Sequence, residues 1–308
     1  MKDQHGRYPA YLPYSQRLFL KARKVYRQAN TRLAESKAMR EGSGHLVPDG
    51  RFEGLKPDVA VFVNSPTAIN KGAWWLEEDL SRPELYTLVK EMENLKKRLA
   101  QKSLRFTNTA ATFLPRMFYP RSERSKIWEN AWVICHSNIN AGDRVLDIGG
   151  ASTPFSFYLA DRQCSVAVLD NDWANCGTIY NANYVAKRMG WDLKAYNRDI
   201  SKPFPFPDNS FDRVFSICTI EHLTSAVRRF MMKETARVLK TGGIAGITMC
   251  YDLNHPVLLV DKGLRFGYRQ KLEADVIGPS GLTVYGNTDL VDYEGIEFLG
   301  ALFLVKNS

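Results

Sequence analysis

The sequence predicts an α/β protein built on a parallel sheet. Three observations carry this prediction: β-prone apolar runs alternate with helical patterns, several of these runs end in an acidic residue, and a pair of glycines follows the first of them. Strands that alternate with helices pair in parallel through right-handed crossovers. The carboxyl ends of such strands form the edge of the sheet at which ligands bind.

The first strand is predicted at 144–148, where the residues are largely apolar and suited to a strand covered on both faces. Asp147 lies at its carboxyl end. Gly149 and Gly150 can adopt backbone angles barred to other residues and allow a ligand to approach the main chain. A helix that begins near Thr153 directs its free N–H groups into the same space. An ordinary strand-to-helix turn accounts equally well for the two glycines alone.

Further strands ending in acids strengthen the case for a ligand site. Asp170 closes the second strand 23 residues after Asp147, near the ~20-residue spacing at which an acid reaches a ribose hydroxyl. The third strand ends near Asp199, and the fourth leads into Glu221 and His222. The predicted elements after the first strand are strands at 165–170, 193–200, 211–220 and 244–250, with a helix at 226–239.

Over about residues 125–308 the chain resembles the class I S-adenosylmethionine-dependent methyltransferases, in particular those of the type 11-like kind. The resemblance implies a Rossmann-like, doubly wound, mostly parallel sheet with an antiparallel last strand. Two glycine places of the family pattern are held here by Ala151 and Thr153. The motifs are LDIGG at 146–150, the acid Asp170, Asp199-Ile200 followed by PFPDNSFD at 205–212, and TIEHL at 219–223 with ARVLKTGG at 236–243.

The resemblance also implies a binding site for S-adenosyl-L-methionine. The first strand and its glycine turn hold the methionine end, the second strand binds the ribose, the third binds the adenine, and the end of the fourth lines the floor beneath the sulfonium. The residues carried over in this order are Asp147, Gly149, Gly150 and Ala151; Asp170 and Asn171; Asp199 and Ile200; and Cys218, Thr219 and Glu221.

A methyl acceptor that is a hydroxyl must lose a proton, and His222 is the candidate general base because an imidazole titrates near neutral pH. A histidine that only hydrogen-bonds its loop fits the sequence equally well. We therefore expect methyl transfer to a small-molecule or saccharide-type acceptor, with oxygen favoured as the methylated atom.

Three other functions account for parts of the sequence. A nicotinamide dehydrogenase is disfavoured, because Ala151 and Pro154 occupy glycine places of the dinucleotide motif. A nucleic-acid methyltransferase is the first alternative, suggested by the basic residues before the predicted domain. Against it, Thr219 to His222 stand where enzymes acting on base amines usually carry Asn/Asp-Pro-Pro-Tyr/Phe. A non-catalytic cofactor-binding or assembly protein remains an alternative, since the glycine pattern is altered.

The basic charge of the chain is concentrated before the predicted methyltransferase domain. Residues 1–140 hold 24 Lys and Arg against 14 Asp and Glu. A basic amphipathic helix at 16–40 can bind an anionic membrane surface or a phosphorylated acceptor; packing against the enzyme is the alternative.

The sequence predicts two regions. The first is a mainly helical cap at 1–121, with a helix at 81–104 that starts in a capping box at Ser81. The second is a methyltransferase domain at 122–308, which opens with a helix at 122–137.

The composition favours a cytoplasmic enzyme. The chain has no basic-then-apolar leader, and its longest apolar run, 298–305, is far shorter than the ~20 residues that span a bilayer. Its five cysteines contain no C-x-x-C pair, so we expect neither a disulfide nor a zinc site. Asp252 and His255 are too few ligands for a metal centre.

Overall fold

The computed structural model describes residues 62–71, 76–104, 106, 122–150, 152–171, 177–252, 269–288 and 297–307. The chain divides into two compact units, Met1–Pro57 and Asp58–Ser308, and every described residue belongs to the second. The predicted basic helix at 16–40 lies outside the described residues. Within them, no helix is both long enough and apolar enough to cross a membrane.

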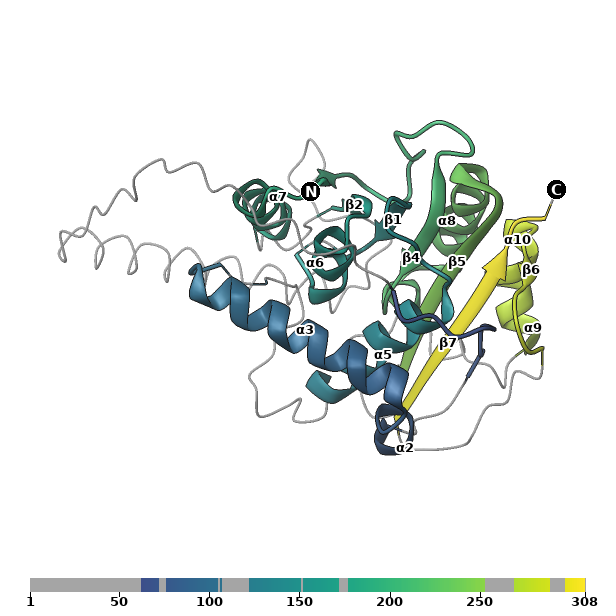
Figure 1. Ribbon diagram of the computed structural model, residues 1–308. Helices are drawn as coiled ribbons and strands as arrows, with labels where there is room; N and C mark the ends of the chain where they lie inside the picture. The colour runs from purple at the N-terminus through teal and green to yellow at the C-terminus, as the bar shows by residue number, and fades with distance from the viewer. Residues whose placement is uncertain are drawn as a thin grey trace. The chain divides into compact units, whose positions relative to one another are not determined.

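A seven-stranded sheet forms the centre of the described unit (Figure 1). The spatial order of its strands is β3-β2-β1-β4-β5-β7-β6. Strands β1 to β5 pair in parallel, whereas β7 runs antiparallel to both of its neighbours. The predicted Rossmann-like, mostly parallel sheet with an antiparallel last strand is thereby confirmed. The strands are β1 (Arg144–Ile148), β2 (Ser165–Asp170), β3 (Leu193–Asn197), β4 (Phe211–Ser216), β5 (Leu239–Asp252), β6 (Thr283–Val284) and β7 (Glu297–Val305).

The helices alternate with the strands as the sequence predicts. The predicted helices at 122–137 and 226–239 appear as α5 and α8, each within one or two residues of the expected bounds. The described helical elements are α2 (Leu76–Leu80), α3 (Pro83–Gln101), α5 (Ser122–His136), α6 (Pro154–Asp161), α7 (Thr178–Met189), the 3-10 turn η2 (Ile220–His222), α8 (Ser225–Val238), α9 (Arg269–Leu272), the π-helical η3 (Glu273–Ile277) and α10 (Gly278–Ser280).

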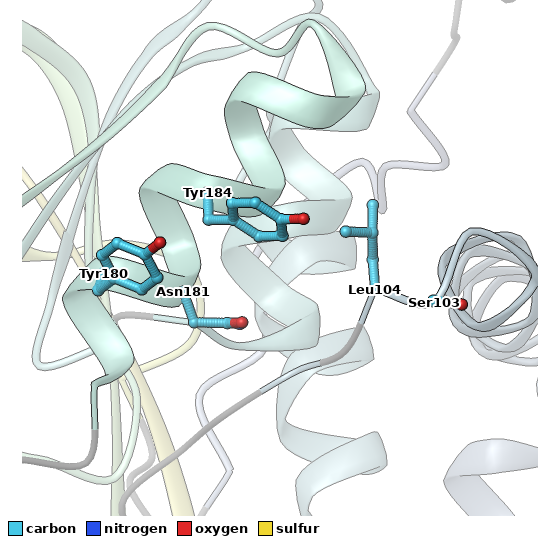
Figure 2. A pocket seen from close by; sticks show the side chains of 5 residues that line it. All are labelled: Ser103, Leu104, Tyr180, Asn181 and Tyr184. Atoms are coloured by element: carbon cyan, nitrogen blue, oxygen red, sulfur yellow. The ribbon is translucent and has the colours of Figure 1, made fainter. Parts of the chain in front are cut away.

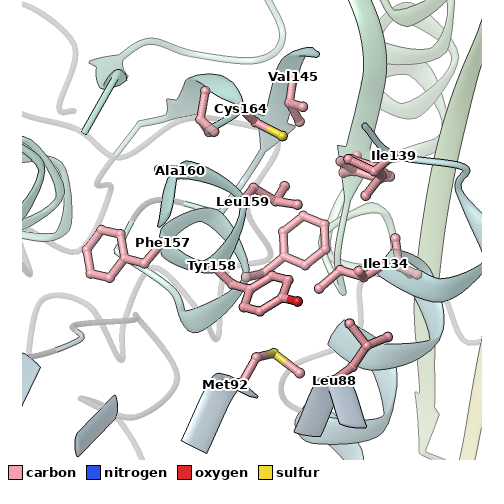
Figure 3. Packing of buried hydrophobic residues seen from close by; sticks show 14 of the residues in the cluster. Leu88, Met92, Ile134, Ile139, Val145, Phe157, Tyr158, Leu159, Ala160 and Cys164 are labelled. Carbon is pink, nitrogen blue, oxygen red and sulfur yellow. The ribbon is translucent and has the colours of Figure 1, made fainter. Parts of the chain in front are cut away.

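Each face of the sheet is covered by its own hydrophobic cluster. Side chains alternate along a strand, so Val145 of β1 enters one cluster and Leu146 the other. The first cluster takes its helical residues from α3, α5, α6 and α7, and the second from α8, α9 and η3. Figure 3 shows Leu88 of α3, Ile134 of α5 and Leu159 of α6 in the first cluster. Burial on both faces explains the apolar neighbours Val145 and Leu146 in β1.

Helix α3 packs onto the sheet-covering helices, although the sequence analysis assigns its residues to the cap. Its Glu91 pairs with Arg162 at 2.6 Å and accepts a hydrogen bond from the hydroxyl of Tyr158 on α6. Its Arg98 forms an ion pair with Asp161 of the same helix. Residues 62–104 therefore share the compact unit of the sheet, and the division into 1–121 and 122–308 stays a prediction.

The start of α3 differs from the prediction of a capping box at Ser81. The helix begins at Pro83, its N-cap residue is Arg82, and no side chain caps it. Ser81 instead donates its hydroxyl hydrogen bond to the C=O of Glu78, at the end of α2. Proline at the first helical position sets the start, because its fixed φ suits the helix and its missing N–H needs no partner.

Three predicted strand bounds are also corrected. The third strand ends at Asn197, before Asp199, and the fourth ends at Ser216, so Cys218 and Thr219 lie in a loop. The fifth begins at Leu239 rather than 244, because Leu239 pairs with Phe211 before the register shifts. Strand ends depend on pairing with a neighbour, which a single sequence does not reveal.

Asn70 ties the segment 62–71 to the far edge of the sheet. Its side chain is buried; Oδ1 accepts the N–H of Phe303 at 2.6 Å, and Nδ2 donates to the C=O groups of Tyr285 at 2.9 Å and Asn287 at 2.7 Å. These three bonds satisfy backbone groups that no strand partner reaches.

We expect Asn70→Ala to lower the free energy of unfolding by about 2–4 kcal/mol, because it leaves buried backbone groups without partners. Denaturant unfolding of the purified chain measures this change. The control is Asn140→Ala, an exposed asparagine whose loss costs under about 0.5 kcal/mol. Equal losses in the two variants would contradict this account of Asn70.

Candidate active site

The carboxyl ends of β1, β2 and β4 meet at one edge of the sheet. Because β1 lies between the other two in parallel, Asp147 pairs in register with Val168 of β2 and Phe215 of β4. Asp170 closes β2, and the loop with Thr219 follows β4. The topology thus brings together residues that are up to 72 positions apart in the sequence.

Asp147 is almost completely buried at this edge, with 1% of its surface exposed. Its Oδ2 accepts a hydrogen bond from the hydroxyl of Ser156 on α6, whereas Oδ1 has no hydrogen-bond partner among the described residues. Burial raises the pKa of Asp147 to about 7; the Ser156 hydrogen bond opposes this rise, and the charge of Asp170 adds to it. A buried carboxylate with an open oxygen is suited to a hydrogen-bond donor or a cation.

Gly149 and Gly150 pack so closely that neither position has room for a side chain. A Cβ at Gly149 would lie 2.3 Å from Oγ1 of Thr219, and a Cβ at Gly150 would lie 1.8 Å from Oδ2 of Asp147. Gly149 also has a φ of +81°. The two glycines therefore let the side chains of Asp147 and Thr219 approach the turn itself. The third predicted turn residue, Ala151, lies outside the described residues.

Thr153 occupies a glycine place of the family pattern and has a structural reason to be there. It is the N-cap of α6, and its Oγ1 accepts the N–H of Ser156 at 3.3 Å. Pro154 follows as the first helical residue. Threonine at the N-cap with proline after it is a favoured start for a helix, so the predicted beginning of this helix is correct.

Asp170 and Asp199 lie at the ends of neighbouring strands. Asp170 is half-buried, pairs in register with Asn197 of β3, and accepts the N–H of Arg198 on its C=O at 2.8 Å. Asn171 follows it and is also half-buried. The predicted ribose and adenine residues are therefore adjacent in the sheet.

The turn after β3 fixes the direction of the Asp199 carboxylate. Its Oδ1 accepts the N–H of Ser201 at 2.9 Å. Ile200, the next residue, is 8% exposed and packs in the hydrophobic cluster of the α8 face. Asp199 and Ile200 thus lie in the same turn, and Ile200 also packs in the hydrophobic core.

Cys218 lies in a strained backbone conformation in the loop after β4. Its φ is +47°, a left-handed value that costs a non-glycine residue roughly 1–2 kcal/mol. Its N–H donates to Oγ1 of Thr248 on β5 at 3.0 Å, and its Sγ donates to Oε1 of Glu129 on α5 at 2.6 Å. Strain of this kind persists only where surrounding contacts hold it, often at functional sites.

The remaining predicted residues of this loop form a turn rather than a strand end. Thr219 donates its hydroxyl hydrogen bonds to the C=O groups of Ile148 at 3.3 Å and Ile217 at 3.2 Å. Glu221 is 1% exposed and His222 is half-buried, both within η2. The structure places His222 three residues after Thr219 on this edge of the sheet, and its role as general base stays a prediction.

Two side chains of the site were missed at the sequence level. Ser156 stands three residues after Thr153, and this N-cap spacing could have placed it beside the turn. Glu129 is fully buried on α5 next to Trp128. The sequence signal for Glu129 is an acidic residue among the apolar residues of a helix. Its contact with Cys218 is apparent only from the fold.

A hollow of about 480 Å³ lies between the end of α3 and helix α7 (Figure 2). Tyr180 and Tyr184 stack there with ring centroids 6.2 Å apart, and both are exposed. Between them Asn181 donates to Oγ of Ser152 at 2.6 Å, which connects the hollow to the loop after the glycine turn. The remaining lining residues are Ser103 and Leu104.

The described residues contain no group of three or more His, Cys, Asp or Glu placed to hold a metal. His255 and the side chain of Asp252 lie outside this description. Burial raises the pKa of the thiols of Cys135 and Cys164 to about 11 and about 12, respectively, so both are protonated structural residues at neutral pH.

We expect Gly149→Ala to destabilise the protein more than Gly142→Ala does. Both glycines have a left-handed φ, but a Cβ at Gly142 meets nothing within 4 Å. The shared backbone cost is about 1–2 kcal/mol, and contact with Thr219 adds about 1–3 kcal/mol at Gly149. Thermal and denaturant unfolding measure both variants, and equal destabilisation would refute close packing at Gly149.

Comparisons with known proteins agree with this geometry. Residues 145–243 match the family model described as a methyltransferase domain. Sterol 24-C-methyltransferase of Pneumocystis carinii is 32% identical over 116 residues, which cover 37% of this chain and 29% of that protein. The enzyme of the same name from Aspergillus fumigatus is 33% identical over 125 residues, covering 38% and 32%. The chain thus spans about a third of the length of these curated relatives.

Among solved structures, an S-adenosylmethionine-dependent methyltransferase of Aquifex aeolicus has a TM-score of 0.40 at 19% identity, covering 53% of this chain and 82% of that one. The family match begins at β1 and ends within β5, so it includes the glycine turn, Asp170 and the loop after β4. Residues 145–243 are therefore similar in sequence to a methyltransferase domain and include β1 to β4 of the sheet.

Proposed function

We propose that this enzyme methylates a small-molecule or saccharide-type acceptor from a donor site built on the edge around Asp147. The observation that carries the proposal is the buried Asp147, whose Oδ1 has no hydrogen-bond partner among the described residues, beside a turn without room for side chains. An open acceptor atom and a bare main chain are what the methionine end of the cofactor requires, since it carries an ammonium group. The residues present therefore fit the cofactor.

The donor site extends from this point across the neighbouring strand ends. We assign the ribose hydroxyls to Asp170 with Asn171 at the end of β2, and the adenine to Asp199 with Ile200 in the turn after the neighbouring strand β3. Cys218, Thr219 and Glu221 form the floor after β4. Ala151 completes the assignment on the family resemblance alone.

When bound, S-adenosylmethionine supplies an electrophilic methyl group on a positively charged sulfur. The residues of this chain contribute by alignment and by handling a proton. The edge residues hold the donor in one orientation, which is worth up to ~7–11 kcal/mol in an in-line displacement. For an oxygen acceptor, Nδ1 or Nε2 of His222 takes the hydroxyl proton as the acceptor oxygen attacks.

A second acceptor class is supported by the curated relatives. Both are named sterol 24-C-methyltransferases, so the activity in their names is methylation of a sterol at a carbon atom. Because the matched segment covers about a third of those proteins, an apolar acceptor methylated at carbon is the second candidate here. The exposed pair Tyr180 and Tyr184 at the hollow suits either a sugar ring or an apolar ring as acceptor. Nucleic acid remains disfavoured.

Binding of the donor is expected to release a proton from Asp147 near pH 6.5. With a pKa of about 7, Asp147 is largely protonated in the free enzyme, and the donor's ammonium group favours the carboxylate. Donor affinity should rise as the pH increases from 6 to 8. Because burial raises the pKa of Asp147 in the folded protein from 3.8 to about 7, the stability that neutral Asp147 gives to the free protein is lost as the pH rises from about 4 to about 7.

Titration calorimetry in buffers of different ionisation enthalpy measures this proton release. Asp147→Asn should abolish it, whereas the control Asp143→Asn should keep it, because Asp143 lies at the other end of β1 and pairs with Arg213. A wild-type binding enthalpy independent of buffer would disprove the assignment to Asp147.

The function itself is tested by methyl transfer from radiolabelled donor to a panel of phenols, saccharides and sterols. We expect transfer to one of the hydroxyl acceptors. For that acceptor His222→Ala should lower kcat by roughly 10²–10⁴ without changing donor affinity.

A loss of less than tenfold in kcat would reject His222 as the base. Transfer only to the sterol would favour the carbon-methylating alternative. Donor binding without transfer to any acceptor of the panel would count against the small-molecule proposal.

A further inference from the structure

Glu129 lies at the site although it comes from α5, before the sheet begins. Its side chain is fully buried, and its Oε1 accepts the thiol hydrogen of Cys218 at 2.6 Å. Its Oε2 pairs with Lys126, one helical turn earlier, at 2.8 Å. The three side chains form a line from the surface of α5 to the loop after β4.

The charges of Lys126 and Glu129 are screened by water to different extents. The side chain of Lys126 is 42% exposed, whereas that of Glu129 is 0% exposed. Water screens the ammonium charge more strongly than the buried carboxylate charge. The electrostatic potential near Cys218 is therefore negative.

The thiol proton of Cys218 and the hydroxyl proton of Thr219 are both directed at acceptors of the protein. A thiol has one proton, and that of Cys218 goes to Glu129. The hydroxyl of Thr219 likewise donates to the backbone carbonyls of Ile148 and Ile217. Neither side chain therefore offers its proton to a ligand.

We propose that Glu129, acting through Cys218, is the positioning residue by which the site prefers the positively charged sulfur of S-adenosylmethionine over the neutral sulfur of the product S-adenosylhomocysteine. The inference rests on the donor site of the proposed function. The two ligands share their adenosine and their amino acid group, so a difference between their affinities reports on the sulfur and its methyl group alone.

Titration calorimetry with each ligand, without any acceptor, tests the proposal. Glu129→Gln should raise the Kd for S-adenosylmethionine about five- to tenfold and that for S-adenosylhomocysteine less than about twofold. The control is Glu91→Gln, which removes a carboxylate that also accepts a side-chain hydrogen bond and pairs with a cation; its partners Tyr158 and Arg162 are not assigned to the donor site. It should change neither Kd by more than about twofold.

Two Cys218 variants test whether Glu129 acts through the thiol. Cys218→Ala should reduce the preference for the charged ligand, and adding Glu129→Gln to it should have little further effect. Cys218→Ser keeps a donor to Glu129 and should retain the preference. If Glu129→Gln does not fold, judged by its thermal unfolding, Cys218→Ala carries the test.

Equal weakening of both ligands in Glu129→Gln, or an unchanged ratio of the two Kd values in Cys218→Ala, would overturn the inference. That result leaves the proposed function standing, because wild-type donor binding and methyl transfer are measured separately. Conversely, a failure to find an acceptor leaves this test intact, since no acceptor takes part in it.

Discussion

The contact between the Asp147 carboxylate and the turn after β1 is the constraint on which the rest of the site depends. Asp147 is central in the sheet and almost completely buried, and Gly150 leaves the space that its Oδ2 requires. The same oxygen accepts the hydroxyl of Ser156, which joins α6 to the strand. Burial of this acid raises its pKa, so the protein gains a protonated group in the free state and a potential anion for a cationic ligand.

The loop after β4 is arranged around that constraint. Thr219 packs on Gly149 and donates to carbonyls at the ends of two strands, and Cys218 takes a left-handed conformation held by Thr248 and Glu129. The cost of that conformation, roughly 1–2 kcal/mol, is offset by hydrogen bonds from β5 and α5. Contacts from β1, β5 and α5 thus determine the conformation of this short loop. The loop is therefore defined by more contacts than its sequence motif alone reveals.

The residues of the proposed donor site lie within the segment that matches the family model, apart from the flanking Glu129. The family match covers 145–243, the segment that contains the edge residues of β1 to β4. The segments on either side add α3 and α5 on one face and β7 at the end of the sheet. One fold hosts many functions, so the proposed acceptor depends on the site and not on the fold.

The sequence by itself determined the fold class, the order of the elements and the acids at the strand ends. Apolar runs, glycine turns and spacing are local signals, so Asp147, Asp170 and the cap at Thr153 could be read from neighbouring residues. Only the tertiary structure decided that Ser156 contacts Asp147, that Glu129 reaches Cys218 across 89 positions, and that β4 ends at Ser216. These features depend on pairing and packing between distant segments, and such contacts leave no periodic trace in a single sequence.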